Sequence, residues 1–316
     1  MNLRQLRQFL AVADELHFGR AAERLGMTQP PLSQSIQALE EELGVRLFSR
    51  TKRSVALTTV GAEWQAHARR LVAEADALPD IARRLARGQL GRLRLAFVST
   101  ADYSILPLLV ARFKAAYPEV EVALQESTSD LQIEALLAGS LDAGLIIPQA
   151  GLHVSLDYLP LVREPLVAAV PEAWIAQGRV RPRGGVLDLD DVLDAPLIVF
   201  PRRIAPDFHD IVTGAYAVRG ASPHVFQEAI QMQTIVALVA VGLGLALVPQ
   251  SLTDLGRSGV RYLALAGDPP EVETGLVWRR GEMLPMVAHL VEMAGALAGE
   301  GRGGAGAPGW RAGAGK

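Results

Sequence analysis

The side chains best suited to chemistry in this chain are the amides and hydroxyls of one short stretch, TQPPLSQSIQAL, at residues 28–39. Leu32, Ile36 and Leu39 have helical spacing there, which leaves a polar but uncharged face on the other side. Glutamine can pair with the edge of adenine in the major groove of DNA, whereas a solvated helix face would more often carry Lys and Glu. The pattern therefore favours base recognition over a solvated face, with the candidate residues Gln29, Pro30, Ser33, Gln34 and Gln37.

Hydroxyl groups form a second pattern, at the ends of two predicted strands. The strand RLRLAFV is followed by Ser99 and Thr100, and the strand EVEVALQE by Ser127, Thr128 and Ser129. Hydroxyls and free backbone N–H groups at the helix starts that follow such strands bind anions where parallel strands end. The same residues can also simply cap the helices, and composition leaves the two interpretations equally open.

An enzyme would need a constellation of reactive side chains that this sequence lacks. There is no cysteine, which excludes a disulfide scaffold, a thiolate metal site and a cysteine nucleophile. The six histidines are at least fifteen residues apart, and no HExxH, GxSxG or phosphate-loop pattern occurs. We therefore predict a protein that is not an enzyme and that has neither a metal nor a cofactor.

Length and composition indicate a globular protein with several domains. With 316 residues, half of them hydrophobic, two or three domains are expected. The net charge is only −3, so nucleic-acid binding has to come from a local face. The first residues lack the apolar core of a signal peptide, and the longest apolar stretch, at 235–249, is too short to span a bilayer. We expect a cytoplasmic protein without membrane contact, which the absence of cysteine also fits.

Three helical patterns and a hairpin must position the polar stretch. Glycines end the second and the third helical pattern, and a pair of helices joined by such a turn is typical of a helix-turn-helix. The segment at 45–58 predicts two strands with a basic tip, a wing whose Arg50, Lys52 and Arg53 contact phosphate or enter the minor groove. Residues 1–58 are thus predicted to form a winged helix-turn-helix.

The paired prolines determine how the third helix starts. If Thr28 is the cap, Pro30 and Pro31 fall in the first turn, where a missing N–H breaks no intrahelical bond. The conformational bias of residues before proline would instead move the start towards Pro31. In either case the helix end is rigid and poor in donors, and it suits a thymine methyl group or a sugar better than a phosphate.

Residues 59–90 form a long helical pattern with a seven-residue repeat of Trp64, Leu71, Leu78 and Leu85. A heptad seam implies a partner helix and therefore a dimer, and the alternative is one side of an intramolecular helix. Pro79 lies inside the pattern and predicts a kink or a break there.

The rest of the chain alternates strands and helices, which is typical of parallel α/β layers. Two comparable halves within residues 91–300 predict two lobes with a cleft between them, lobe I at about 91–162 and 267–300 and lobe II at about 163–266. The Gly- and Ala-rich residues 301–316 have no periodicity, so we expect them to form a disordered tail.

Residues 6–61 resemble the N-terminal domain of LysR-type transcriptional regulators, with few departures. One is His17, where the family more often has a serine or asparagine that opens the second helix. The resemblance implies a winged helix-turn-helix, a long linker helix and a two-lobed α/β effector-binding domain similar to a periplasmic binding protein, assembled as homodimers or homotetramers through the linker. Family positions that contact DNA fall on Thr28, Gln29, Pro30, Pro31, Ser33, Gln34, Gln37, Arg50 and Arg53.

Similar regulators bind a small-molecule inducer between the lobes, against the two hydroxyl loops. The resemblance places there Ser99, Thr100, Thr128, Ser129, Phe200, Pro201, Arg202, Gln227 and Gln233. Motifs such as LPLL and GLGLALVP look most like the branch that controls aromatic-acid and chlorocatechol breakdown, so an aromatic-derived organic acid such as muconate is the first candidate inducer. Against it, Ile147 stands where several relatives have an arginine, and Asp102 disfavours a dianion, so Arg202 or Arg203 would have to supply the positive charge.

The predicted function is regulation of transcription. An inducer would shift the closure of the lobes, the subunit spacing and the bending of promoter DNA, so that RNA polymerase is recruited or released. Two alternatives stay open. An effector-independent architectural DNA-binding protein would not need the paired lobes, and a solute-binding protein would lack the helix-turn-helix and would need a signal peptide.

Overall fold

The computed structural model describes residues 1–50, 54–148, 151–281 and 283–302. The chain divides into two compact units, Met1–Arg84 and the part from Leu85 onwards. The boundary between them lies near the end of one helix, α4 (Thr59–Ala86). Within the described ranges, no helix is both long and apolar enough to cross a membrane.

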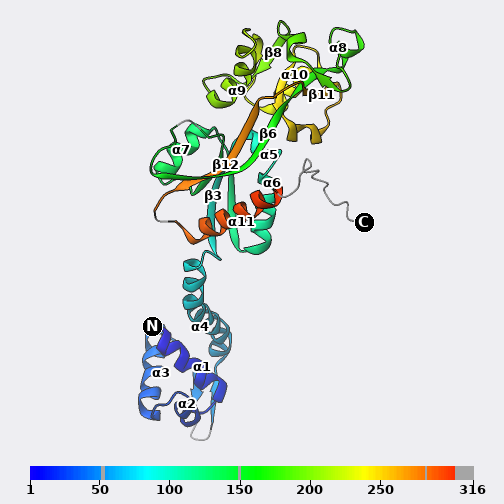
Figure 1. The fold of residues 1–316 in the computed structure, drawn as a ribbon. Helices are drawn as coiled ribbons and strands as arrows, with labels where there is room; N and C mark the ends of the chain where they lie inside the picture. Colours follow the sequence, from blue (N-terminus) through cyan, green and yellow to red (C-terminus); the bar gives the residue numbers. More distant parts are fainter. Residues whose placement is uncertain (51–53, 149–150, 282, 303–316) are drawn as a thin grey trace. The chain divides into compact units, whose positions relative to one another are not determined.

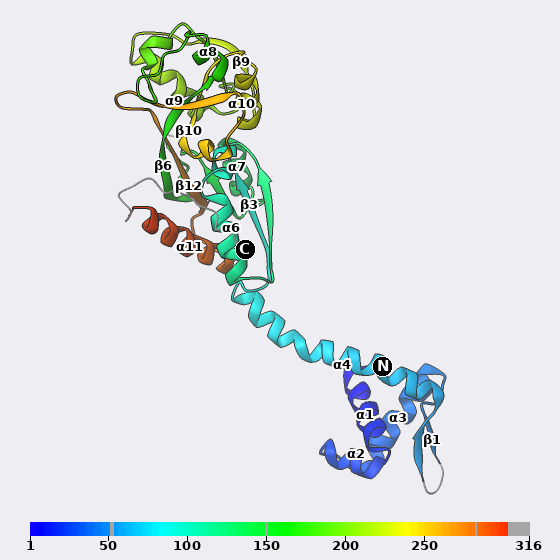
Figure 2. The same cartoon turned by 90° about the vertical axis from the view of Figure 1, so that its right-hand side faces the viewer.

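The N-terminal unit contains three short helices, a hairpin and most of α4 (Figure 2). Its further elements are α1 (Leu3–Glu15), α2 (Phe18–Arg24), α3 (Gln29–Leu43), β1 (Phe48–Arg50) and β2 (Val55–Leu57). The two strands pair antiparallel, as a wing requires. Apolar side chains from the helices and from β1 meet in one core, among them Phe9, Phe18, Ile36 and Phe48.

The starts of α1 and α2 are each set by a side-chain cap. Asn2 and Gln5 form a reciprocal capping box at α1. His17 caps α2, because its Nδ1 atom accepts hydrogen bonds from the backbone N–H groups of Gly19 and Arg20 at 3.0 and 3.2 Å. The imidazole therefore takes the capping role that a serine or asparagine would have at this position.

The start of α3 has no side-chain cap. The helix begins at Gln29 with Thr28 as the cap residue, so a start nearer Pro31 is wrong. A cap side chain normally accepts from the N–H groups at the second and third helical positions, which are Pro30 and Pro31 here and carry no N–H. Thr28 accordingly makes no capping hydrogen bond, and the fixed φ angles of the prolines suit the first turn.

The helix α4 is continuous through Pro79, so a break at this residue is wrong. Proline leaves the carbonyl of residue 75 without its N–H donor, but this part of the helix is exposed and water can bind that carbonyl. Near its start, α4 packs on its own unit: the Trp64 ring meets the Phe9 ring edge to face at 4.7 Å, and Ala68 is buried. Further along, the leucines of the heptad repeat are exposed.

In the C-terminal unit a mixed sheet and its flanking helices form two lobes (Figure 1). Lobe I contains β3 (Gly91–Phe97), α5 (Ser99–Asp102), α6 (Leu106–Ala116), β4 (Val120–Glu126), α7 (Ser129–Leu137), β5 (Ala143–Ile146), β12 (Glu271–Arg279) and α11 (Pro285–Arg302). The strand β3 pairs in parallel with β4 and β5, so the loops after these strands lie at one edge of the sheet.

One long strand, β6 (Leu156–Pro171), passes from lobe I into lobe II (Figure 1). Up to Pro165 it pairs antiparallel with β12, and from Leu166 it pairs with β10 and β11. The other elements of lobe II are α8 (Glu172–Ala176), β7 (Val186–Leu187), η1 (Leu189–Val192), β8 (Pro196–Val199), α9 (Pro206–Ala217), β9 (His224–Glu228), α10 (Met232–Ala240), β10 (Ala246–Pro249), η2 (Gln250–Leu255) and β11 (Val260–Leu265).

Two features differ from the sequence prediction. The predicted strand LVAAV is only the end of β6, because Pro160 and Pro165 interrupt the apolar pattern without interrupting the strand. The helix α11 continues to Arg302, into residues expected to form a tail. Its end is held by Glu300, which accepts two hydrogen bonds from Arg112 of α6 at 2.8 and 2.7 Å. The remainder of that segment, from residue 303, lies outside the described residues.

Candidate functional site

The outward face of α3 carries the candidate DNA-binding residues. The apolar stripe of Leu32, Ile36 and Leu39 is fully buried beneath it. On the other side Thr28, Gln29, Pro30, Pro31, Gln34 and Gln37 are exposed and Ser33 is partly buried. The structure thus places these seven residues on one accessible surface of a helix that is anchored from below, the arrangement that a recognition helix needs.

Arg50, on the wing, is held inside the unit. Its guanidinium donates to the Ser33 hydroxyl at 3.3 Å and to the Glu40 carboxylate at 3.4 Å, and it lies 4.6 Å from the centre of the Phe18 ring. Only 30% of the side chain is exposed. In this conformation Arg50 fixes the wing against α3 and is not extended towards a phosphate. The other predicted wing residues, Lys52 and Arg53, lie outside the described residues.

Glu40 is a residue of this site that sequence reasoning missed. It looks like part of an exposed acidic run with Glu41 and Glu42, yet its side chain is only 9% exposed. Its Oε1 atom accepts hydrogen bonds from the backbone N–H groups of Leu47 and Phe48 at 2.8 and 2.9 Å. Glu40 therefore binds the first strand of the wing to the recognition helix.

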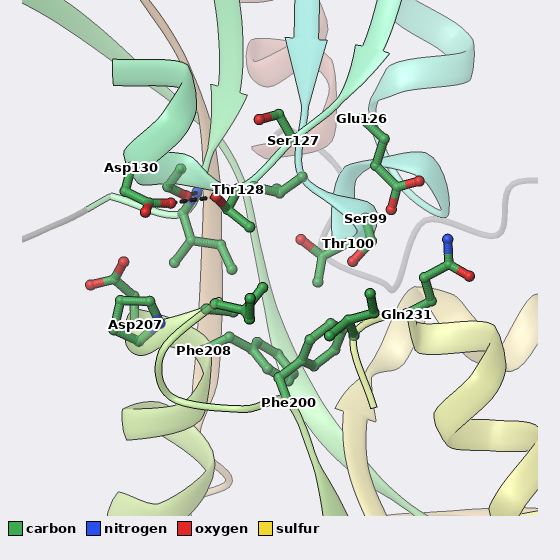
Figure 3. Close-up of a pocket in the computed structure, with 17 residues that line it drawn as sticks. Ser99, Thr100, Glu126, Ser127, Thr128, Asp130, Phe200, Asp207, Phe208 and Gln231 are labelled. Atoms are coloured by element: carbon green, nitrogen blue, oxygen red, sulfur yellow. Dashed lines mark hydrogen bonds between the residues drawn. The ribbon is translucent and has the colours of Figure 1, made fainter. Parts of the chain in front are cut away.

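The C-terminal unit contains a pocket where the two lobes meet (Figure 3). Its volume is about 290 Å³, the size of a small metabolite's binding site. Lobe I contributes the loops after β3 and β4, including Ser99, Thr100, Thr128 and Ser129. Lobe II contributes Phe200 and the start of α9. Five of the nine predicted effector residues thus lie together in one cavity.

The hydroxyls in this pocket have different surroundings. Ser129 Oγ accepts from the backbone N–H of Ile147 at 3.2 Å, and the Thr128 hydroxyl donates to the Asp130 carboxylate. Thr128 makes no capping hydrogen bond at the start of α7, and the cap residue of α5 is Val98, whose side chain cannot make one. Thr100 is 3% exposed, and its hydroxyl has no hydrogen-bond partner among the residues that the structure describes.

Three carboxylates that sequence reasoning did not select also line the pocket. Glu126 ends β4, Asp130 lies in the first turn of α7, and Asp207 lies in the first turn of α9. None of the described lining residues is a lysine, arginine or histidine. The only signal in the sequence was position next to the hydroxyl loops, which does not distinguish a pocket carboxylate from a solvated one.

Four predicted effector residues do not line this pocket. Pro201 is buried beside Phe200 without reaching the cavity. Arg202 is exposed and donates to Asp210 at 2.8 and 2.9 Å, which lowers the pKa of Asp210 to about 2. Gln227 lies on β9, where its amide donates to the backbone carbonyl of Glu228. The last, Gln233, lines a separate cavity in lobe II. The expected source of positive charge, Arg202, is therefore already paired outside the pocket.

A winged helix-turn-helix followed by a two-lobed α/β domain with a ligand-sized pocket defines a class of DNA-binding regulators with an effector-binding domain. Residues 3–62 match the bacterial regulatory helix-turn-helix protein, lysR family, and residues 86–298 match the LysR substrate binding domain. The chain belongs to the LysR family of transcriptional regulators. This confirms the family and the fold predicted from the sequence, and it confirms that the chain is not an enzyme.

Individual relatives cover nearly the whole chain. The chain is 57% identical over 295 residues to the HTH-type transcriptional regulator IlvR of Caulobacter vibrioides, which covers 93% of this chain and 97% of IlvR. The structure of full-length CbnR in complex with its target DNA is similar with a TM-score of 0.75 and 31% identity, over 94% of this chain and all of CbnR. Full-length BenM has a TM-score of 0.59 and 28% identity, over 95% and 97% of the two chains.

Proposed function

We propose that this chain binds promoter DNA in the cytoplasm as a homodimer or homotetramer, and that a small effector between the lobes changes how it binds and how RNA polymerase is recruited. The observation that carries the proposal is the pocket itself, which is built from loops of both lobes. A ligand that contacts both walls stabilises one lobe arrangement over others, and only such a differential contact can shift a conformational equilibrium.

Base recognition is assigned to the exposed amides of α3. Gln29, Gln34 and Gln37 share an accessible face with Ser33, and the prolines remove N–H donors that would otherwise bind phosphate. The similarity to CbnR, whose structure contains its target DNA, supports this use of the helix. Arg50 is proposed to act on DNA through the position of the wing, with Arg53 as the phosphate or minor-groove contact.

A footprint of the full-length protein on the DNA upstream of its own gene tests the proposal. We expect a protected site whose extent changes when the effector is added. No protected site at moderate salt would contradict a DNA-binding regulator of that promoter. A site that no effector changes would favour the effector-independent architectural alternative.

Replacing Gln29 by alanine tests base recognition. We expect the variant to lose about 1–3 kcal/mol of discrimination between its specific site and random DNA, because a base contact is lost while phosphate contacts stay. Competition binding measures both affinities, with Gln177→Ala, an exposed glutamine of lobe II, as the control. An equal loss on specific and random DNA would show that Gln29 does not contact bases.

Two similarities of the chain point to different kinds of inducer. An aromatic-derived acid such as muconate fits the resemblance to the branch for aromatic-acid breakdown, and the effector of BenM is benzoate. The chain is, however, much more similar to IlvR, at 57% identity, than to BenM, at 28%. The footprinting experiment should therefore be repeated with benzoate, with muconate and with candidate ligands of other charge.

A further inference from the structure

The walls of the effector pocket carry three carboxylates. Glu126, Asp130 and Asp207 line it, and the described lining includes no basic side chain. Glu126 forms no hydrogen bond or ion pair with another described residue. In Figure 3 it lies beside Ser99 and the Gln231 amide on one side of the cavity, and the two aspartates lie on the other.

The helix starts around the pocket are already occupied by the chain's own acids. A helix N-terminus attracts an anion because its N–H dipoles sum to a partial positive charge. The helices α7 and α9 both begin at the pocket, and each has an aspartate in its first turn that lines it: Asp130 and Asp207. These carboxylates offset the partial positive charge, so an incoming carboxylate gains little from the helix starts and meets like charges nearby.

The remaining polar groups are acceptors or can act as acceptors. The buried Thr100 hydroxyl, 3% exposed and without a partner among described residues, lines the cavity with the Ser99 hydroxyl. An unpartnered buried hydroxyl costs free energy, which a ligand that hydrogen-bonds to it recovers. Carboxylates accept only, hydroxyls accept and donate, and an ammonium group donates three hydrogen bonds and accepts none. A ligand group that donates several hydrogen bonds and carries positive charge would therefore suit this wall best.

Much of the opposite wall is apolar. Phe200 and Phe208 are both buried and meet edge to face, with ring centres 5.5 Å apart and an angle of 82° between the rings. Figure 3 shows the two rings on the lobe II side of the cavity, facing the hydroxyl loops of lobe I. A hydrocarbon or aromatic group of the ligand would pack on this wall. The volume of about 290 Å³ suits a small metabolite.

We propose that the effector of this pocket is a small molecule that carries an ammonium group next to an apolar body, with the ammonium group against Glu126 and the hydroxyls of Ser99 and Thr100. The proposal rests on the proposed function, because it names the ligand class of the same pocket. An amine or an amino-acid zwitterion belongs to this class, and a simple organic dianion does not. The ammonium group would contact lobe I while the body contacts lobe II, so the ligand would bridge the lobes.

The neighbourhood of Glu126 supports a negative potential at this end of the pocket. Burial and the charges of Asp102 and Glu126 raise the pKa of the Tyr103 hydroxyl, which opposes ionisation there, although a hydrogen bond with Gln233 acts in the other direction. Glu126 forms no ion pair with a described residue, whereas Arg202 and Arg163 are paired with Asp210 and Glu273 outside the pocket. A cationic ligand would complete the charge balance of the site.

Three probes with one aromatic body and different charges test the proposal: phenethylamine, L-phenylalanine and 3-phenylpropionate. Calorimetric titration of the full-length protein should give both ammonium compounds a dissociation constant at least about tenfold below that of the carboxylate, a difference of about 1.4 kcal/mol. L-leucine and muconate extend the series to a smaller body and to a dianion. Tighter binding of the acids, or no binding of any ammonium compound, would overturn the proposal.

Two variants separate the role of Glu126 from general electrostatics. Glu126→Gln should remove the preference for ammonium compounds by about tenfold while leaving the weak affinity for 3-phenylpropionate unchanged or improved. Glu134→Gln, an exposed glutamate on α7 away from the lining, should keep the preference. An unchanged preference in Glu126→Gln would contradict the assignment.

The footprinting experiment distinguishes a failure of the proposed ligand class from a failure of the proposed regulatory function. If acids rather than amines alter a specific footprint, the ligand class is wrong and the regulatory function stands. If the protein protects no site under any condition, the regulatory function fails whatever the titrations show.

Discussion

At the scale of single residues, Glu164 makes the stability of the C-terminal unit depend on pH. It is 9% exposed on β6, where its carboxylate accepts from the N–H of Ser251 at 2.7 Å and from its hydroxyl at 3.1 Å. Burial raises the pKa of Glu164 above its ordinary value of 4.5, and the two hydrogen bonds oppose this only in part. The folded state thus binds the proton more tightly than the unfolded state. Its contribution to stability is fully present below pH 4.5 and is lost as the pH rises through the folded pKa.

Replacing Glu164 by glutamine should remove this loss. The amide oxygen can still accept from the Ser251 N–H, and the neutral side chain has no charge to desolvate. We expect the midpoint of thermal unfolding of Glu164→Gln, relative to wild type, to rise as the pH is raised from about 4 to about 7. Calorimetry at several pH values measures it, with the exposed Glu134→Gln as a control that should show no such trend. A constant difference at all pH values would show that burial does not shift this group.

The pocket illustrates which single residues a sequence can predict. Ser99, Thr100, Thr128 and Ser129 were predictable because hydroxyls that follow parallel strands must meet at one sheet edge. Glu126 was not, since one carboxylate in a strand looks the same whether it faces solvent or a cavity. Arg202 was wrongly assigned to the pocket. Its ion pair with Asp210 of α9 depends on how the chain enters that helix, which the periodicity of the sequence does not show.

At the scale of elements, two glycines in helices should respond to alanine in opposite ways. An ideal Cβ on Gly61 of α4 would lie 2.1 Å from the backbone carbonyl oxygen of Leu47, next to the wing. A Cβ on Gly214 of α9 meets nothing within 4 Å. We expect Gly61→Ala to destabilise the N-terminal unit by about 1–3 kcal/mol through overpacking. Gly214→Ala should stabilise the C-terminal unit by about 0.5–1 kcal/mol, the usual gain in a helix.

Denaturant unfolding of the full chain distinguishes the two glycine effects. Trp64 is in the N-terminal unit and Trp174 and Trp278 are in the other, so single-tryptophan versions of the chain would report each unit separately. A gain in stability for Gly61→Ala would contradict the close approach of α4 to Leu47, and a loss for Gly214→Ala would contradict the open space around Gly214.

The sequence predicted best those elements whose hydrophobic pattern has a single period and whose surroundings stay the same along their length. The helices of the N-terminal unit follow the 3.6-residue period, and β3, β4 and β5 are short apolar strands. The strand β6 was recognised only in part because its two halves have different partners, β12 in lobe I and β10 and β11 in lobe II. A strand whose surroundings change halfway has no single hydrophobic pattern. The domain boundaries near residues 163 and 267 therefore stay a prediction.

At the scale of the whole molecule, the family and the fold were predictable because the recognition helix has a distinctive sequence, whereas the assembly was not settled by its heptad repeat alone. The residues of this repeat have different surroundings in the structure. Trp64 packs on its own unit, while Leu71, Leu78 and Leu85 have 47%, 60% and 47% of their surface exposed. The intramolecular interpretation thus applies to the start of α4, and the exposed leucines leave a partner helix as a prediction for the rest. We propose that the exposed leucines form the dimer contact.

Replacing Leu71 and Leu78 together by glutamate should dissociate the protein into subunits. Each leucine buried in an interface contributes about 1.5–3 kcal/mol, and a twofold contact loses two copies of each, so the dissociation constant should rise by several orders of magnitude. Light scattering coupled to size exclusion measures the mass, with Val218→Glu as the control, since this valine belongs to lobe II and is 87% exposed. Paired helix-turn-helix units bind a two-part DNA site, so the variant should also lose the specific footprint while it still binds effector. An unchanged mass would move the dimer contact away from these leucines, and an unchanged footprint from a monomer would contradict binding of paired units.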